Sequence, residues 1–315
     1  MRLSSTSLRI SIVFAVACAP ATVAPGADAH VPDVDAGPQL EEFADIGATT
    51  EGLAIGRTPG GAPVLYVGTL DDRIVRIAPD GVVADFVTVN DPLGIAVRED
   101  GSLVVAAKRA EADGGAAVLL LIAPDGTTSE LVSAGPGDAP LGVTNFVAIA
   151  PDGSLVFSDS MANRLFRADA DGAEVTLITD AITYPNGLAF SPDGATLYVA
   201  SWDGRSVHAL SFDRATSSYG APAVAQAGVA NVDGIVSTID GALYLVTSAR
   251  GILRTDPASP AAPATVVPMG TIALPANAVF GDAAFGESTL YVTSLASRVI
   301  HRIVTADRGA PLPPR

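Results

Sequence analysis

Basic residues are scarce in this sequence. Lysine and arginine together number 18 against 34 aspartate and glutamate residues, the formal net charge is −16 at pH 7, and Lys108 is the single lysine. A protein that binds the nucleic-acid backbone needs clustered positive charge. The composition therefore argues against a nucleic-acid partner, whereas the acidity itself suits solubility.

Cysteine and histidine are also rare, with one cysteine, Cys18, and three histidines. A single cysteine forms no internal disulfide. The chain also lacks a Gly-x-Ser-x-Gly elbow, a zinc-ligand spacing and a phosphate-binding loop. These absences exclude the common serine, cysteine and zinc hydrolases, and any catalytic site has to be built from other groups.

The longest apolar run near the amino terminus, residues 10–19, is too short to cross a bilayer. Arg2 and Arg9 precede it and small residues follow, which is the layout of an export signal. We predict a signal peptide over residues 1–29 and a linker over 30–38. Ala15-Val16-Ala17-Cys18 resembles a bacterial lipobox, which would attach a lipid to Cys18 and anchor the protein in the cell envelope. Cleavage after Ala29 would instead release a free periplasmic or extracellular protein. Both alternatives stay open.

Glycine and proline are abundant, at 31 and 23 residues, and hydrophobic residues make up 49 % of the chain. Glycine and proline divide the chain into short segments rich in Val, Ile, Leu, Thr and Tyr, which favours strands over helices. The composition predicts an all-β protein with a large core.

An internal repeat predicts the architecture. Six similar segments begin 38 to 52 residues apart, at Leu65, Leu103, Leu155, Leu197, Leu243 and Leu290. Each follows a small apolar strand and precedes one or two further strands, so each repeat has room for about four strands, as in a propeller blade. The sixth repeat lacks its outer strand, and residues 40–46 can supply it.

We therefore predict an all-β, six-bladed β-propeller over residues 39–306, with four antiparallel strands per blade and a ring closed by an N-terminal strand in the last blade. A closed ring is expected to be a monomer. The remaining tail, residues 307–315, is rich in proline and is expected to supply no ladder donors.

Polar residues begin several of the predicted innermost strands. Aligning the six repeats places the following residues at one level of the central channel: Glu51, Leu93, Asn145, Asn186, Asp233 and Gly281. Two carboxylates and two amides in a narrow channel are costly unless a cation neutralises them. An all-oxygen set is typical of a hard cation, and calcium fits better than magnesium, although another divalent cation stays open.

A simpler explanation exists for two of these residues. Asn186-Gly187 and Asp233-Gly234 are typical turn pairs, so a turn role stays open for either one alone. Turn chemistry does not explain Glu51 or Asn145, and the set as a whole favours a metal site.

The same residues carry a family resemblance. Glu51-Gly52, Asn145, Pro185-Asn186-Gly187 and Asp233-Gly234, with the turns that follow them, resemble the motifs of the senescence-marker-protein/gluconolactonase/luciferin-regenerating-enzyme family. The resemblance implies a six-bladed propeller with a divalent ion, usually calcium, held by Glu51, Asn145, Asn186 and Asp233. It also implies hydrolysis of a lactone or related ester, with Asp233 as base or nucleophile and Asn145 both binding the metal and contacting the substrate.

The third repeat departs from the family pattern. Family lactonases often carry Asn-Asp there, with an arginine shortly before it, whereas this chain has Gly142-Val143-Thr144-Asn145-Phe146. The resemblance therefore supports the metal set more strongly than a sugar-lactone substrate.

The ends of the second strands are predicted to lie at the mouth of the channel. Three residues there are candidate contacts for a small-molecule substrate, namely Trp202, Lys108 and Asp159.

Two other functions stay open. A propeller that resembles strictosidine synthase uses a channel carboxylate without a metal, and a binding propeller has no catalytic activity, because one fold hosts many functions. The four oxygen ligands favour the hydrolase.

Overall fold

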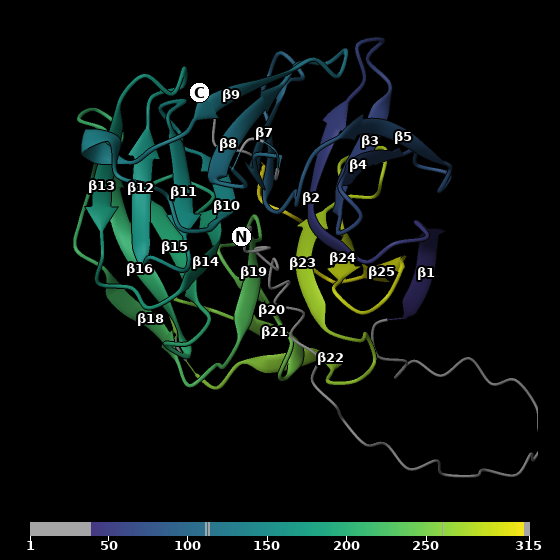
Figure 1. Ribbon diagram of the computed structural model, residues 1–315. Coiled ribbons are helices and arrows are strands. Elements are labelled where there is room, and N and C mark those ends of the chain that lie inside the picture. Colours follow the sequence, from purple (N-terminus) through teal and green to yellow (C-terminus); the bar gives the residue numbers. More distant parts are fainter. Residues whose placement is uncertain (1–38, 111, 113, 260, 312–315) are drawn as a thin grey trace, which may run out of the picture. The chain divides into compact units, whose positions relative to one another are not determined.

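The computed structural model describes residues 39–311 except 111, 113 and 260, and almost all of its regular structure is strand (Figure 1). The predicted signal peptide and linker, with Cys18, lie outside the described residues. Among the described residues, no helix combines the length and apolar character that crossing a membrane requires.

Six antiparallel sheets form six blades, numbered here in chain order. Blade 1 comprises β2 (Thr50–Arg57), β3 (Pro63–Thr69), β4 (Arg73–Ile77) and β5 (Val83–Thr88). Blade 2 comprises β6 (Ile95–Val97), β7 (Leu103–Lys108), β8 (Ala117–Ile122) and β9 (Thr128–Val132). A 3₁₀ helix, η2 (Pro136–Asp138), precedes blade 3, which comprises β10 (Thr144–Ile149), β11 (Leu155–Asp159), β12 (Arg164–Ala168) and β13 (Val175–Thr179).

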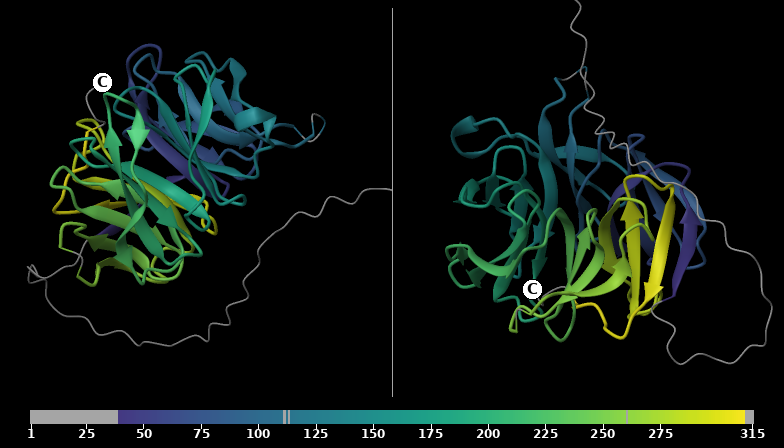
Figure 2. Two further views of the ribbon diagram at one scale, coloured as in Figure 1. Left: turned by 90° about the vertical axis from the view of Figure 1, so that its left-hand side faces the viewer. Right: turned by 90° about the horizontal axis from the view of Figure 1, so that it is seen from below.

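Blade 4 comprises β14 (Pro185–Phe190), β15 (Thr196–Ser201), β16 (Ser206–Asp213) and β18 (Ala223–Ala227), and the short β17 (Ser218–Tyr219) also pairs with β16. Blade 5 comprises β19 (Val232–Ser237), β20 (Leu243–Thr247), β21 (Gly251–Thr255) and β22 (Ala264–Pro268). Blade 6 comprises β23 (Pro275–Phe280), β24 (Thr289–Ser294), β25 (Val299–Val304) and β1 (Leu40–Asp45). The blades follow one another around the ring in chain order (Figure 2).

Blade 6 closes the ring as predicted. Strand β1 pairs antiparallel with β25, with Leu40 opposite Ile303 and Asp45 opposite Val299. Arg302 and Arg298 form ion pairs with Glu41 and Asp45, but these pairs are largely exposed and contribute little. The backbone ladder between the two ends of the chain therefore provides most of the closure.

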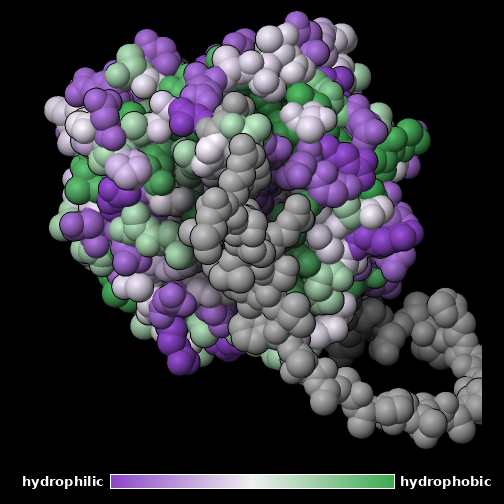
Figure 3. Space-filling view, in the orientation of Figure 1, coloured by the Kyte–Doolittle hydropathy of each residue, from purple (hydrophilic) through white to green (hydrophobic). Residues whose placement is uncertain are grey.

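The core consists of six apolar clusters, one between each pair of neighbouring blades. Between blades 2 and 3, for example, Val104 and Leu119 pack with Phe157 and Phe166. The second strand of each blade is buried because both of its faces contact such clusters. Where no grey atoms cover the surface in Figure 3, hydrophilic and hydrophobic residues are interspersed.

The segment after β25 crosses the end of blade 5. We call residues 305–311 the C-terminal strap. The Ala310 amide donates to the Ser237 carbonyl at 2.9 Å, and the Ile239 amide donates to the Arg308 carbonyl at 3.0 Å. The expectation that this segment supplies no ladder donors is therefore wrong, because Gly309 and Ala310 retain the N–H groups that proline lacks.

Asp307 anchors the strap to blade 5. Its carboxylate accepts hydrogen bonds from Arg254 Nε at 2.6 Å and from the Tyr244 hydroxyl at 2.8 Å. The Arg254 bond, helped by the one from Tyr244, holds the pKa of Asp307 below its usual value. A lowered carboxyl pKa stabilises the fold above the unfolded-state value, and this stability is lost as the pH falls through the folded-state value.

We expect Asp307→Asn to lower the free energy of unfolding by about 1.5–3 kcal/mol at pH 7, the range for a charge-assisted hydrogen bond. The difference from wild type should shrink as the pH falls below about 4. Urea unfolding between pH 3 and 7 measures it. A difference that is the same at every pH would show that the charge of Asp307 is not responsible.

Candidate metal centre

Five of the six inner strands begin with the same irregularity. In β2, Thr50 pairs with Thr69 and Leu53 pairs with Val67, so two residues of β2 face one residue of β3. The same shift recurs at the start of β10, β14, β19 and β23. Such a β-bulge changes the direction of a side chain at the end of a ladder. Four bulges contain equivalent polar residues, here called the bulge quartet: Glu51, Asn145, Asn186 and Asp233.

The register corrects one position of the predicted column. Gly281 lies beyond the opposite end of β23, and the residue of blade 6 equivalent to Asn186 is Ala276. The alignment failed because blade 6 lacks both signals: Ala276 replaces the polar residue, and Asn277 replaces the glycine that follows it in blades 1, 4 and 5.

Asn186 and Asp233 lie inside strands, so the turn role does not apply to them. The glycines that follow the bulge residues have a packing reason instead. A Cβ on Gly187 would lie 2.3 Å from the Asp233 carbonyl oxygen, and one on Gly234 would lie 2.2 Å from Asn277 Oδ1. Neighbouring inner strands therefore approach too closely for any larger residue.

The bulge quartet is buried without a full set of partners. Each of its side chains is at most 9 % exposed. One oxygen of each has no hydrogen-bond partner, namely Glu51 Oε2, Asn145 Oδ1, Asn186 Oδ1 and Asp233 Oδ1. Buried polar atoms are rarely left unpaired, so four such atoms at equivalent positions need an explanation.

Both carboxyl groups of the bulge quartet have raised pKa values. Burial, with the negative charges of Asp233 and Asp91, raises the pKa of Glu51 well above its usual value. Burial also raises the pKa of Asp233 to about 7, although a hydrogen bond from the Asn186 side chain acts in the opposite direction. Asn186 donates a hydrogen bond to Asp233, and the charge of Asp233 acts on Glu51. These three side chains therefore lie near one another, although they come from three different blades.

Comparison with known proteins assigns the family. The family model described as the SMP-30/gluconolactonase/LRE-like region matches residues 58–296, more than half of the chain. The protein is a member of the SMP-30/gluconolactonase/LRE-like family. The match includes Asn145, Asn186 and Asp233 but begins after Glu51, which the structure shows to be their equivalent in blade 1. No curated protein sequence matches the chain.

Solved structures share the fold at low identity. A gluconolactonase from Xanthomonas campestris is 20 % identical with a TM-score of 0.71, covering 85 % of this chain and 89 % of its own. A luciferin-regenerating enzyme is 18 % identical with a TM-score of 0.69, covering 88 % and 99 %. The calcium-binding protein regucalcin from Agrobacterium tumefaciens is 18 % identical with a TM-score of 0.66, covering 87 % and 95 %.

In this SMP-30/gluconolactonase/LRE-like propeller the donor set fits a hard divalent cation. Two carboxylates and two amide oxygens are the ligands that calcium accepts, and a cation would partner the four orphaned oxygens and offset the repulsion between Glu51 and Asp233. Among the described residues there is no cluster of three or more His, Cys, Asp and Glu side chains, because half of this set is asparagine.

Two further residues belong to the site and were missed from the sequence. Asn277 is 1 % exposed, and both polar atoms of its side chain lack partners. Tyr184 is half-buried and directly precedes β14, two residues before Asn186, and burial with the charges of Asp233, Asp203 and Glu51 raises the pKa of its hydroxyl. Asn277 was hidden by the misaligned blade 6, and Tyr184 lies directly before β14, outside the column of residues that was compared.

The three predicted rim residues have different surroundings. Lys108 Nζ lies 2.5 Å from Asp91 Oδ2, so it neutralises an acid whose charge reaches Glu51. The Trp202 amide donates to the Tyr184 carbonyl at 3.1 Å, and the indole is half-buried. Both lie beside the site, and their contact with substrate stays a prediction.

Asp159 has a structural role instead of the predicted substrate contact. Its side chain is fully buried and lies 2.9 Å from Arg164 Nη2. Its carboxylate also accepts hydrogen bonds from the Gly142 and Val143 amides. Asp159 therefore fixes the loop that leads to Asn145, and its oxygens are already occupied.

Proposed function

We propose that the protein is a calcium-dependent hydrolase of a lactone or related ester, with its site at the bulge quartet. The observation that carries this proposal is the set of four buried, unpartnered oxygens, two of them on carboxyl groups that burial drives toward neutrality. The family membership and the gluconolactonase-like fold support the reaction class.

Each residue of the bulge quartet has a role in this proposal. When bound, calcium supplies a Lewis acid for the ester carbonyl. The Asp233 carboxylate accepts a proton from the attacking water. It returns this proton to the departing alkoxide as the bond between the carbonyl carbon and the leaving-group oxygen breaks. In the alternative mechanism, Asp233 itself attacks the carbonyl carbon. The amides of Asn145 and Asn186 orient water and substrate by hydrogen bonds. Glu51 holds the metal and takes no part in proton transfer.

Hydrolysis should require the metal. We expect a panel of γ- and δ-lactones and aryl esters to contain a substrate whose turnover falls by about 100-fold or more with EGTA and returns with calcium. Hydrolysis that chelation leaves unchanged would contradict the mechanism. Stabilisation by calcium without hydrolysis of any panel member would favour a binding propeller.

We propose a monomeric protein that is exported to the cell envelope or beyond, either anchored to a membrane by a lipid on Cys18 or released after cleavage at Ala29. The arginines and the apolar run of the leader support export. Mass spectrometry of the mature protein distinguishes a lipidated Cys18 from cleavage after Ala29.

A further inference from the structure

A second site lies on the same strands as the bulge quartet. The inner strands and the C-terminal strap line an open-ended cavity of about 590 Å³, and many of the lining residues follow the bulges. Leu53 and Leu188 line it, and each lies two residues after a member of the quartet. Two residues of strand correspond to about 7 Å, so the cavity begins close to the proposed metal.

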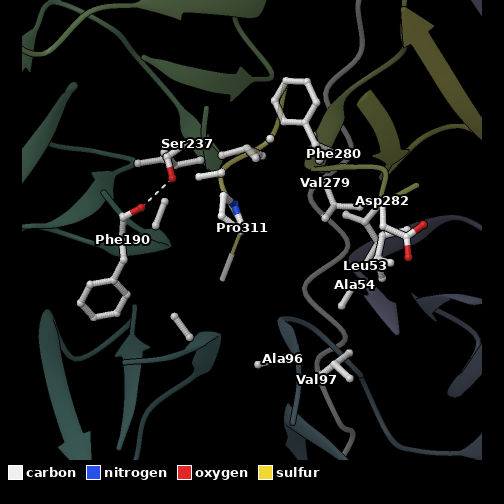
Figure 4. A pocket seen from close by; sticks show the side chains of 18 of the residues that line it. Leu53, Ala54, Ala96, Val97, Phe190, Ser237, Val279, Phe280, Asp282 and Pro311 are labelled. Carbon is white, nitrogen blue, oxygen red and sulfur yellow. Dashed lines mark hydrogen bonds between the residues drawn. The ribbon is translucent and has the colours of Figure 1, made fainter. Parts of the chain in front are cut away.

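The lining is mostly apolar, and four of its residues have polar or charged side chains, namely Ser237, Asp282, Glu287 and Arg308. Side chains of Ala54, Ala96, Val97 and Val279 surround the space, and Pro311 of the strap projects near its centre (Figure 4). The Ser237 hydroxyl already donates to the Phe190 carbonyl at 2.6 Å. A sugar would lose hydrogen bonds to water here without replacing them, whereas an alkyl chain loses none.

The charged residues at the cavity rim are paired with one another. Arg308 lies 3.2 Å from Glu287, and Arg57 lies 3.5 Å from Asp282. Of these four residues, Asp282, Glu287 and Arg308 line the cavity and Arg57 does not, so the lining offers an anion two acids and a single arginine that is already paired. The cavity therefore suits an uncharged aliphatic group rather than a fatty acid anion.

Phe146 extends the apolar wall to the level of the metal site. It directly follows Asn145 and lines the cavity, whereas the equivalent position is glycine in blades 1, 2, 4 and 5. The backbone of Phe146 is held in place, because its amide donates a hydrogen bond to the Ser158 hydroxyl at 3.0 Å. Apolar surface therefore reaches the residue next to a proposed metal ligand.

We propose that this cavity holds an unbranched alkyl chain of the substrate, which makes the substrate a lactone or ester with an aliphatic substituent. This inference rests on the proposed function, since it places the reacting carbonyl at the bulge quartet. The volume lies within the range of about 300–1,000 Å³ found for small-molecule sites.

A homologous series of lactones with longer alkyl substituents tests the proposal. We expect kcat/KM to rise by about fourfold per added methylene until the cavity is filled. Ala96→Leu fills part of the cavity. We expect it to reduce the ratio of kcat/KM between the longest and the shortest lactone by about tenfold or more. Ala223→Leu is the matched control, because Ala223 is exposed on β18 and far from the channel. Ala54→Val serves as a milder filling variant should Ala96→Leu fail to fold.

Binding of the neutral dye N-phenyl-1-naphthylamine gives a readout that needs no turnover. We expect the dye to bind wild type, Ala223→Leu and Asp233→Asn alike, and Ala96→Leu about tenfold more weakly. Equal binding to Ala96→Leu, or hydrolysis without chain-length dependence, would overturn the alkyl site and leave the hydrolase intact. Dye binding that Ala96→Leu weakens, without hydrolysis of any ester, would retain the apolar site and overturn the proposed function.

Discussion

Calcium should raise the melting temperature of the wild-type protein and leave that of Asp233→Asn unchanged. At a calcium concentration of 100 times Kd, binding to the native state alone adds about 2.7 kcal/mol to the free energy of unfolding. For a domain of this size we expect a shift of roughly 5–10 °C. Differential scanning fluorimetry with EGTA or calcium measures it.

The same variant should behave differently without the metal. In EGTA, we expect Asp233→Asn to be at least as stable as wild type, because it removes a buried carboxyl group that repels Glu51. In calcium, the order should reverse. Loss of a merely structural side chain would instead lower stability under both conditions, so the reversal identifies a ligand.

Asp282→Asn is the matched control for this experiment. Asp282 lies at the opposite end of the channel, where its carboxylate contacts the exposed Arg57 at 3.5 Å. We expect this variant to keep the full response to calcium. An equal loss of response in both variants would point to a general effect of acidic charge and contradict the proposed ligand set.

The blades were predictable because their sequence signals repeat. The buried second strand beginning at Leu65 recurs in every blade, and the Pro-Asp-Gly turns have a local cause. In blade 4, Asp193 accepts a hydrogen bond from the Ala195 amide at 3.0 Å, and Gly194 has a φ of 71°. Such signals depend on a few neighbouring residues and are visible in the sequence.

The site was predictable only where the repeat extends into it. Asn145 and Asn186 were found as members of a column, whereas Asn277 was missed because blade 6 has alanine at the polar position and no glycine after it. The contacts of Asp159 join the loop before β10 to the start of β12 within blade 3, whereas Tyr184 is near Glu51 and Asp233 of two other blades. No short sequence pattern encodes these contacts, because Gly142 and Asp159 are 17 residues apart and the surroundings of Tyr184 form only in the closed ring.

Gly52→Ala should be among the most destabilising single substitutions in the propeller. A Cβ at this position would lie 1.8 Å from the Leu93 carbonyl oxygen. That backbone cannot move aside easily, because the Leu93 amide donates to the Ala106 carbonyl at 2.8 Å and the Gly94 amide donates to the Asn145 carbonyl at 2.7 Å. We expect a loss of about 3 kcal/mol or more in the free energy of unfolding.

Gly60→Ala separates this steric effect from the general effect of replacing glycine. Gly60 lies in the turn between β2 and β3, and a Cβ there would have only Thr58 Oγ1 nearby, at 3.9 Å. We expect a change within about 0.5 kcal/mol in the free energy of unfolding, measured by urea unfolding of both variants.

Because Gly52 adjoins Glu51, Gly52→Ala should also weaken calcium binding in the fraction of the protein that still folds. Equal stability of the two variants would mean that β2 and β6 are not packed as closely as the fold requires, and the bulge quartet would then have no rigid frame to bring it together.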